Sequence, residues 1–199
     1  MSETWESIYR SNQEMWGHEP TPSTLLIKDF FIEKGIKNIL IPGFGYGRNA
    51  QVFIENGMNV TGIEISLTAI KKARKQFGFH SKIHHGSVLD MPFDTNEYDG
   101  IYCYSLIHLL DSEEREVFVQ NCYNQLSKGG IMVFVVVSKN AVNYGSGKYV
   151  SKDRYEVHKG LKLYFYDTES IQAEFGPYGL FEFVEIEEDL TFYIVKCKK

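Results

Sequence analysis

Short apolar runs alternate with segments of helical pattern along most of the 199-residue chain. We expect strands at residues 38–41, 59–65, 82–85, 100–104 and 131–137. Strands that are separated by helices form right-handed βαβ units, and such units build a parallel sheet with helices on both faces. The alternation therefore predicts an α/β fold.

The C-terminal part of the chain breaks this alternation. Two strand-like segments, Leu180–Glu187 and Thr191–Lys196, are joined only by Glu188, Asp189 and Leu190. So short a connection forms an antiparallel hairpin. Together with the earlier strands, it predicts a doubly wound, mostly parallel, seven-stranded sheet with an antiparallel C-terminal hairpin.

Length and composition favour a single domain over residues 1–199, because 43% of the residues are hydrophobic and can form a sizeable core. Residues 1–35 precede the first strand and carry aromatic residues that require burial, and we interpret them as a helical lid. Residues 138–166 follow the fifth strand and begin with a stretch rich in Gly, Asn, Ser and Lys. We interpret this segment as an insertion near the active site.

Charge and apolar patterning exclude several kinds of partner. The net charge of −5 is spread along the chain without a run of five like charges, so we expect no binding of nucleic acid. The longest apolar runs, such as 131–137, are far shorter than a membrane span. Three cysteines and a polar N-terminus without a signal-peptide core predict a cytoplasmic protein with reduced thiols. We expect a monomer or a homodimer.

The first expected strand runs into three glycines on alternate positions, in Ile-Leu-Ile-Pro-Gly-Phe-Gly-Tyr-Gly-Arg-Asn at 39–49. In an open parallel sheet, ligands bind beyond the carboxyl ends of the strands, where this turn lies. Glycine lets the backbone approach a ligand closely, and free N–H groups at the start of the following helix attract negative charge. A purely structural turn is the alternative, and the loop alone does not exclude it.

A carboxylate at the end of the second expected strand favours a ligand. Glu64 lies in Gly-Ile-Glu-Ile-Ser at 62–66, so its side chain is expected beside the glycine loop at the same sheet edge. A carboxylate there can accept both hydroxyls of a ribose. The two features together predict a nucleoside ligand.

Two nucleoside cofactors fit this pattern. Residues 45–50 match a dinucleotide-binding fingerprint, with Glu64 at about the right distance downstream. An NAD enzyme, however, needs a second half-sheet or domain, and the C-terminal hairpin uses the remaining chain. A Tyr-x-x-x-Lys match at 144–148 contains two glycines, which disfavour the helix that this motif requires. The alternative cofactor is S-adenosylmethionine.

Five features carry a resemblance to a known family. They are Ile-Pro-Gly-Phe-Gly-Tyr-Gly at 41–47, Gly-Ile-Glu-Ile-Ser at 62–66, Gly-Ser-Val-Leu-Asp-Met-Pro-Phe at 86–93, Tyr-Asp-Gly-Ile-Tyr-Cys-Tyr-Ser-Leu-Ile-His at 98–108, and the terminal hairpin. Through them the chain resembles class I S-adenosylmethionine-dependent methyltransferases over nearly its whole length. The proline in the first motif, Trp5 and the stretch 16–20 resemble the thiopurine methyltransferase-like and tellurite-resistance-like enzymes.

The resemblance implies a Rossmann-like fold and a set of residues that bind S-adenosylmethionine or its product S-adenosylhomocysteine. These are Trp16, Gly43, Phe44, Gly45, Gly47, Asn49, Glu64, Ile65, Ser87, Val88, Leu89, Tyr104 and Ser105. Two positions depart from the family pattern, because Ile41 and Ser87 stand where relatives often have acids. The backbone of Val88 and Leu89, or the Asp90 carboxylate, is then the alternative contact for adenine.

Methyl transfer from a sulfonium is an in-line displacement, in which the protein mainly aligns the reacting atoms. We predict a small-molecule methyltransferase (EC 2.1.1.-) whose acceptor atom is S, Se or Te, N or O. A base is needed only when the nucleophile arrives protonated. The alternatives are an NAD(P)-binding oxidoreductase and a non-catalytic S-adenosylmethionine-binding protein.

Histidines suggest two further roles. His108 is the best candidate for a catalytic base, although a histidine at a helix start more often bonds to the backbone. His80, His84 and His85 form no expected metal site, because neighbouring strand residues point to opposite faces and no Cys or carboxylate cluster completes the set.

Overall fold

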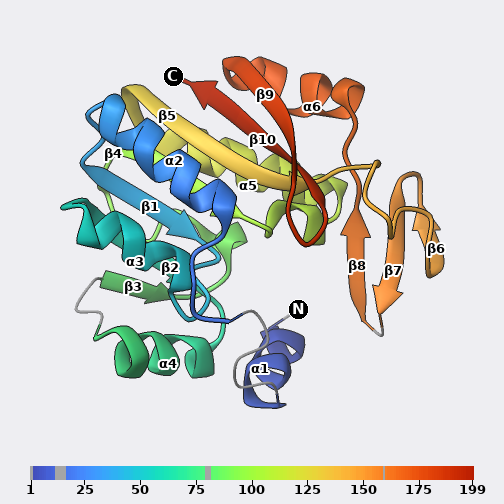
Figure 1. Ribbon diagram of the computed structural model, residues 1–199, viewed down its shortest axis with the longest axis horizontal. Coiled ribbons are helices and arrows are strands. Elements are labelled where there is room, and N and C mark those ends of the chain that lie inside the picture. Colours follow the sequence, from blue (N-terminus) through green and yellow to red (C-terminus); the bar gives the residue numbers. More distant parts are fainter. Residues whose placement is uncertain (1, 12–16, 79–81, 159) are drawn as a thin grey trace.

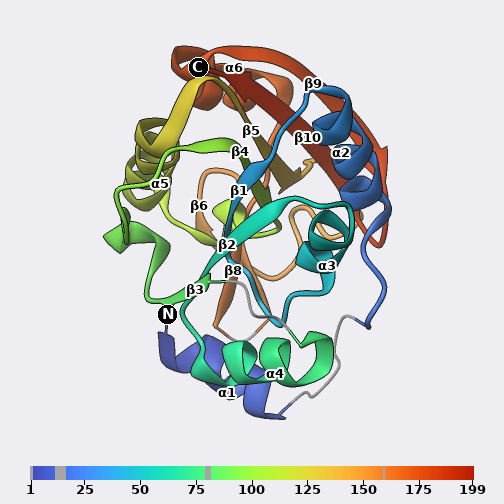
Figure 2. The ribbon, with the colours of Figure 1, turned by 90° about the vertical axis from the view of Figure 1, so that its left-hand side faces the viewer.

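The computed structural model describes residues 2–11, 17–78, 82–158 and 160–199. A seven-stranded sheet of order β3-β2-β1-β4-β5-β10-β9 runs through the molecule (Figures 1 and 2). Its strands are β1 (Asn38–Pro42), β2 (Asn59–Glu64), β3 (Lys82–His85), β4 (Tyr98–Tyr104), β5 (Leu126–Val137), β9 (Leu180–Glu187) and β10 (Thr191–Lys198). β1 to β5 pair in parallel, whereas β10 pairs antiparallel with β5 and β9. The predicted α/β sheet and its C-terminal hairpin are confirmed.

Helices cover both faces of this sheet. They are α1 (Ser2–Ser11), α2 (Pro22–Glu33), α3 (Arg48–Glu55), α4 (Leu67–Phe77), α5 (Ser112–Gln125) and α6 (Thr168–Phe175). α2, α3 and α4 contribute side chains to one hydrophobic core, and α5 and α6 contribute to the other. Figure 2 shows α5 on one side of the sheet and α2 and α3 on the opposite side.

Alternate residues of a strand point to opposite faces, so each strand contributes to both cores. In β1, Ile39 and Ile41 join the core under α2 and α3, and Leu40 joins the core under α5. All of residues 131–137 are buried, as expected for an apolar run that is covered on both faces.

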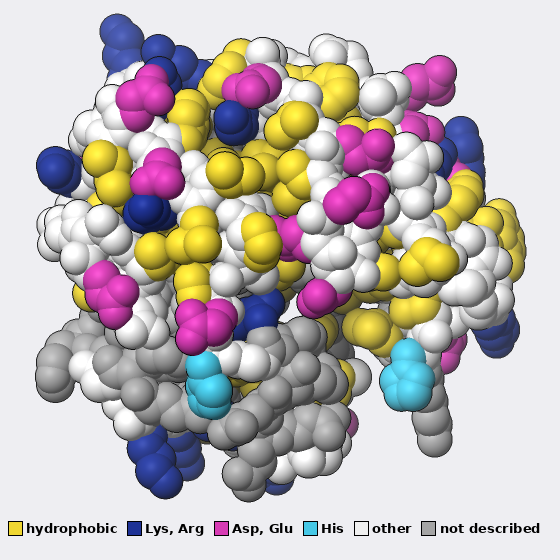
Figure 3. Space-filling model, in the orientation of Figure 1, with side chains coloured by type: hydrophobic (Ala, Val, Ile, Leu, Met, Phe, Trp, Pro, Cys, Tyr) yellow, Lys and Arg dark blue, Asp and Glu magenta, His cyan; other side chains and the backbone are white. Residues whose placement is uncertain are grey.

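α2 is part of the fixed packing of the sheet. Its Phe31 is fully buried against Phe53 of α3, with ring centroids 5.9 Å apart. Its outer side leaves Leu26 57% and Ile32 47% exposed, and Figure 3 shows hydrophobic side chains on the face that carries α2. Within residues 1–35, α2 therefore packs on the sheet. The lid stays a prediction for the segment that precedes α2.

One predicted helix boundary is wrong. In the sequence, Asp111 with Glu114 three residues later is a capping-box pattern that predicts a helix ending near residues 128–130, but α5 ends at Gln125 and β5 begins at once. The reason is the C-terminus of the chain, because Gly129 N–H donates to the carbonyl of Lys199 at 2.8 Å. This bond holds the glycine segment in the sheet.

Residues 138–166 contain a second, three-stranded antiparallel sheet that the sequence did not predict. Its strands are β6 (Lys148–Ser151), β7 (Arg154–His158) and β8 (Leu161–Tyr164). Gly147 enters it with φ of 83°, and a Cβ at this position would lie only 2.2 Å from the carbonyl oxygen of Glu156. In Figure 1 this small sheet extends beyond the end of the main sheet, on the side away from β2 and β3.

Candidate active site

A cavity of about 350 Å³ opens at the carboxyl ends of the parallel strands. Ile41, Ile63, Tyr104 and Val137, at or near the ends of β1, β2, β4 and β5, all lie in its wall. The order of the sheet reverses between β1 and β4, and open α/β sheets bind ligands at such a switch point. The topology therefore places this cavity where a ligand site is expected.

The glycine loop between β1 and α3 forms one wall of the cavity. Gly43, Gly45 and Gly47 have φ of 71°, 59° and 92°, in the left-handed region that favours glycine. Gly47 is the N-cap of α3 and has no side chain to cap it, and the start of a helix attracts negative charge. A Cβ on Gly43 would lie 3.0 Å from Cδ1 of Leu106, so the leucine side chain would have to shift by a few tenths of an ångström.

Glu64 closes the same wall from the end of β2. Its side chain is buried and accepts hydrogen bonds from Gly45 N–H at 2.7 Å and Ser66 N–H at 2.8 Å. Burial raises the pKa of Glu64, and the backbone donors act in the opposite direction. A carboxylate has about four lone-pair sites, so these two bonds leave capacity for ligand hydroxyls.

The segment after β3 contributes Gly86, Ser87 and Val88 to the cavity wall. The Ser87 hydroxyl accepts a hydrogen bond from Leu89 N–H at 3.2 Å and so caps a short 3₁₀ helix at Val88–Asp90. Leu89 is not among the residues that line the cavity, and the side chain of Asp90 is exposed. The structure therefore supplies backbone groups of residues 86–88, and not Leu89 or Asp90, at this wall.

The end of β4 carries two predicted residues. Tyr104 lines the cavity and donates its hydroxyl to Glu188 at 3.0 Å, which links β4 to the β9–β10 hairpin. Ser105 has φ of 56°, a conformation that residues other than glycine adopt at a cost and that is frequent at functional sites. Its N–H donates to the carbonyl of Val135.

His108 lines the cavity, but its geometry does not suit a base. Its Nδ1 accepts the N–H of Val137 at 3.3 Å, which uses the lone pair that a base requires and leaves the proton on Nε2. Complete burial lowers the pKa of His108 to about 3, so the ring is neutral at physiological pH. The structure favours the backbone-bonded interpretation of this histidine.

Most of the residues predicted to bind the cofactor meet at this one cavity. Those that line it are Gly43, Phe44, Gly45, Gly47, Asn49, Glu64, Ile65, Ser87, Val88, Tyr104 and Ser105. The Asn49 amide oxygen also accepts the N–H of Thr21 at 3.1 Å, which joins α3 to the start of α2. Trp16 lies outside the described residues.

The opposite end of the cavity is apolar, and the sequence did not identify it. We call it the leucine end; its side chains are Leu109, Leu161, Leu163, Leu190 and Phe192. Leu161 and Leu163 come from β8, so the insertion does reach the cavity. The available signal was the alternation of two leucines in β8. The aromatic side chains of the insertion pack on one another instead, with the ring centroids of Tyr144 and Tyr155 5.7 Å apart.

Two side chains of α1 also line the cavity at the side of Glu64. Trp5 and Tyr9 lie against the glycine loop, and Tyr9 is buried with its ring 6.4 Å from Tyr46. We call the region of Gly45, Glu64, Ser87 and Val88, with these two aromatics, the Glu64 end of the cavity.

Other candidate sites find little support in the part of the chain that the structure describes. No three His, Cys, Asp or Glu side chains of the described residues gather as metal ligands would. Nε2 of His84 lies 3.0 Å from Oδ2 of Asp94, and Nε2 of His85 lies 3.1 Å from the carbonyl oxygen of Ile65. His80 is outside the described residues. The helices described here are also too short or too polar to span a bilayer.

Comparison with known proteins relates the chain to methyltransferases. A methyltransferase domain family matches residues 40–134. Probable thiol methyltransferase 2 of Arabidopsis thaliana is 25% identical over 158 residues, which cover 76% of this chain and 69% of that protein. An uncharacterized methyltransferase of Geobacillus sp. is 36% identical over 89 residues, which cover 44% of this chain and 41% of its relative.

The fold is shared with a solved enzyme structure. The 1,6-didemethyltoxoflavin-N1-methyltransferase of Burkholderia thailandensis, with bound 1,6-didemethyltoxoflavin and S-adenosylhomocysteine, superposes with a TM-score of 0.78. The sequences are 14% identical, and the match covers 100% of this chain and 86% of the other. The matched domain at residues 40–134 contains the glycine loop and Glu64. Residues 40–134 therefore match a methyltransferase domain, and the whole chain shares the fold of a methyltransferase that binds S-adenosylhomocysteine.

Proposed function

We propose that the protein transfers the methyl group of S-adenosylmethionine to a small-molecule nucleophile by in-line displacement. The observation that carries the proposal is the division of one cavity into a polar Glu64 end and an apolar leucine end. Bound S-adenosylmethionine supplies a methyl group on a sulfonium, and the chain supplies the alignment and the exclusion of water. Alignment of this kind contributes roughly 7 to 11 kcal/mol to rate enhancement.

The Glu64 end has groups that fit the nucleoside part of the cofactor. The buried Glu64 carboxylate would accept the ribose hydroxyls, and backbone groups of Ser87 and Val88 would contact the adenine. Tyr104 and Ser105 follow from β4 toward the leucine end and would hold the methionine part. The aromatic face of Tyr104 suits a positively charged sulfur.

The leucine end favours a small, apolar acceptor. β8 and the β9–β10 hairpin both contribute side chains to this wall, so it is built from several elements around a confined space. Confined apolar walls with few polar groups are typical of small-molecule sites. The names of the similar proteins, a thiol methyltransferase and a methyltransferase of a heterocyclic nitrogen, are compatible with such an acceptor.

The geometry of His108 further restricts the nucleophile. Because its Nδ1 is occupied by Val137 N–H, His108 can donate a hydrogen bond into the cavity but cannot take up a proton without losing the backbone bond. An acceptor that is already ionised or has a free lone pair at neutral pH requires no base. Thiols, selenols and heterocyclic nitrogens therefore suit the site better than aliphatic alcohols.

Binding and turnover test the proposal separately. Isothermal calorimetry should show binding of S-adenosylmethionine and S-adenosylhomocysteine, and no binding of NAD. Thermal melts should show a rise in stability of about 2.7 kcal/mol at a hundredfold excess of ligand over its dissociation constant. Formation of S-adenosylhomocysteine should then be measured with a panel of thiols, selenols, amines and phenols. Binding of NAD alone would refute the proposal, and cofactor binding without turnover of any acceptor would favour a non-catalytic binding protein.

A further inference from the structure

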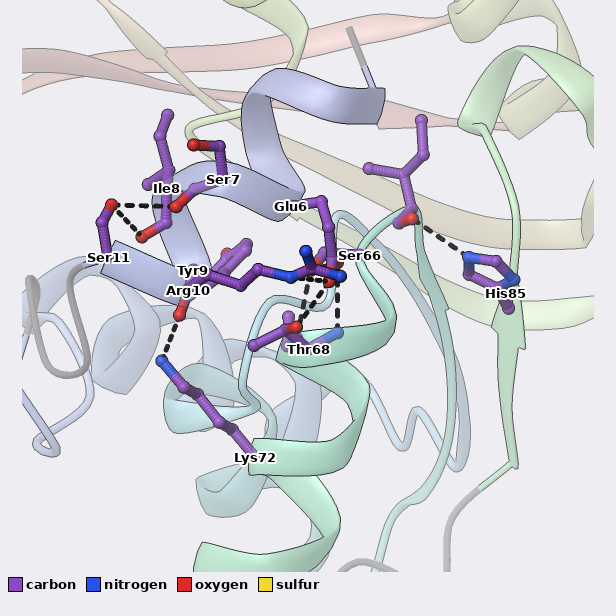
Figure 4. Close-up of polar contacts among 12 residues, drawn as sticks. Glu6, Ser7, Ile8, Tyr9, Arg10, Ser11, Ser66, Thr68, Lys72 and His85 are labelled. Carbon is purple, nitrogen blue, oxygen red and sulfur yellow. Dashed lines mark hydrogen bonds and ion pairs between the residues drawn. The ribbon is translucent and has the colours of Figure 1, made fainter.

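α1 lies against α4, and a single carboxylate makes most of the polar contact (Figure 4). Glu6 accepts hydrogen bonds from the Ser66 hydroxyl at 2.6 Å, the Thr68 hydroxyl at 2.5 Å and the Thr68 N–H at 3.2 Å. A second contact joins the same helices, because the Lys72 ammonium donates to the carbonyl of Tyr9 at 2.5 Å. Glu6 thus binds the first turn of α4, where a negative charge is favoured by the free N–H groups and the helix dipole.

Ser66 connects this contact to the cofactor site. Its hydroxyl donates to Glu6, while its backbone N–H donates to Glu64 at 2.8 Å. One residue therefore joins a carboxylate of α1 to the carboxylate at the end of β2. Trp5 and Tyr9, which lie on the same helix as Glu6, form part of the cavity wall.

We propose that Glu6 is a positioning residue for the cofactor, which holds Trp5 and Tyr9 against the Glu64 end of the cavity and so slows the release of S-adenosylhomocysteine. This inference rests on the proposed function, since it requires that the cofactor occupies the Glu64 end. The ionised side chain of Glu6 thereby keeps α1 over the site.

The loss of Glu6 should release α1 and leave the rest of the fold intact. α4 has its own N-cap, because the Ser66 hydroxyl also accepts the N–H of Ala69 at 3.1 Å. The Glu6 side chain is 23% exposed, so water can reach the donors that it leaves. The hydrogen bonds from Ser66 and Thr68 lower the pKa of Glu6 to about 2, so the carboxylate is ionised at physiological pH.

The experiment uses the full chain with Trp16→Phe as the parent. The chain has two tryptophans, so Trp5 alone then reports on the position of α1. Glu6→Gln removes the charge, Glu6→Asp keeps it on a shorter side chain, and Glu3→Gln makes the same charge change at an exposed position of the same helix. Three quantities are measured for each variant. They are the dissociation rate of S-adenosylhomocysteine by surface plasmon resonance, the quenching of Trp5 fluorescence by acrylamide, and the melting temperature without ligand.

We expect Glu6→Gln to speed dissociation of S-adenosylhomocysteine about tenfold, as the loss of hydrogen bonds to a charged group implies. Trp5 quenching should increase, and the melting temperature without ligand should fall by no more than about 5 °C, because only the docking of α1 is lost. The dissociation rate of Glu6→Asp should lie between those of the parent and Glu6→Gln. The dissociation rate of Glu3→Gln should equal that of the parent.

Three results would overturn the inference. They are an unchanged dissociation rate in Glu6→Gln, an equal effect of Glu3→Gln, and a fall in melting temperature without any change in dissociation, which would make Glu6 a structural cap of α4. A wild-type chain that binds no S-adenosylhomocysteine would refute the proposed function and, with it, the cofactor role of Glu6. Acrylamide quenching without ligand would still show whether Glu6 holds α1 in place.

Discussion

At the Glu64 end the cavity is bounded by backbone N–H groups, a buried carboxylate and the start of α3, whereas at the leucine end it is bounded by aliphatic side chains of the 3₁₀ helix after β4, β8 and the hairpin. The first wall is made by turns that follow β1, β2 and β3 directly, so it is fixed by the sheet. The second wall is built from β8, the β9–β10 hairpin and the segment after β4, which lie far apart in the sequence. Under the proposed function, the wall fixed by the sheet holds the cofactor and the wall from the attached elements holds the acceptor.

The largest expected effect comes from the polar end. Glu64→Ala removes a charged acceptor of ribose hydroxyls, and hydrogen bonds to charged groups contribute about 1.5 to 3 kcal/mol. Affinity for S-adenosylhomocysteine should therefore fall about 10- to 100-fold in calorimetry. The variant must remain folded by circular dichroism, and unchanged affinity in a folded variant would remove Glu64 from the site.

The pH dependence of stability tests the neutral state of His108. Its pKa is lowered from 6.5 to about 3 in the folded protein, so below pH 6.5 the unfolded chain binds a proton that the folded chain does not. Stability from this group is therefore present above pH 6.5 and is lost as the pH falls toward 3. The difference in unfolding free energy between wild type and His108→Gln should shrink by about 2 kcal/mol from pH 7 to pH 5. A constant difference in urea titrations would mean that the pKa of His108 is the same in the folded and the unfolded chain.

A substitution at the apolar end should separate acceptor from cofactor. Leu161→Asp places a charge in the wall from β8, and the loss of apolar contact should raise the KM of an apolar acceptor about tenfold. Affinity for S-adenosylhomocysteine should stay within about twofold, as expected when the two ends act independently. If cofactor affinity falls as much as acceptor affinity, the division of the cavity is wrong.

The smallest expected effect is at Asp90. Its side chain is exposed and lies outside the cavity wall, although the sequence offered it as an adenine contact. Asp90→Asn should change affinity for S-adenosylhomocysteine by less than about twofold, within the range of a surface substitution. A tenfold loss in calorimetry would return Asp90 to the site.

The residues of the polar end line one cavity, and the sequence could group them because its signals there are local. The glycines, Glu64 and Ser66 lie within one strand–helix–strand unit, and each follows a strand whose pattern is clear. The caps at Thr21 and Asp111 are equally local, since each side chain bonds to a backbone N–H three residues ahead.

The apolar end could not be predicted in the same way. Leu109 and Phe192 both line this end although they lie 83 positions apart, and only the assembled sheet brings them together. The strands β6 to β8 are short and rich in polar residues, so their pattern carried little signal. The end of α5 was missed because a contact with the last residue, Lys199, overrides the local preference of the glycines.

A crystal structure with S-adenosylhomocysteine tests the central claim most directly. The account predicts both ribose hydroxyls within hydrogen-bonding distance of the Glu64 carboxylate, with the sulfur directed toward the leucine end. Electron density for the ligand outside this cavity, or with the sulfur at the Glu64 end, would contradict it.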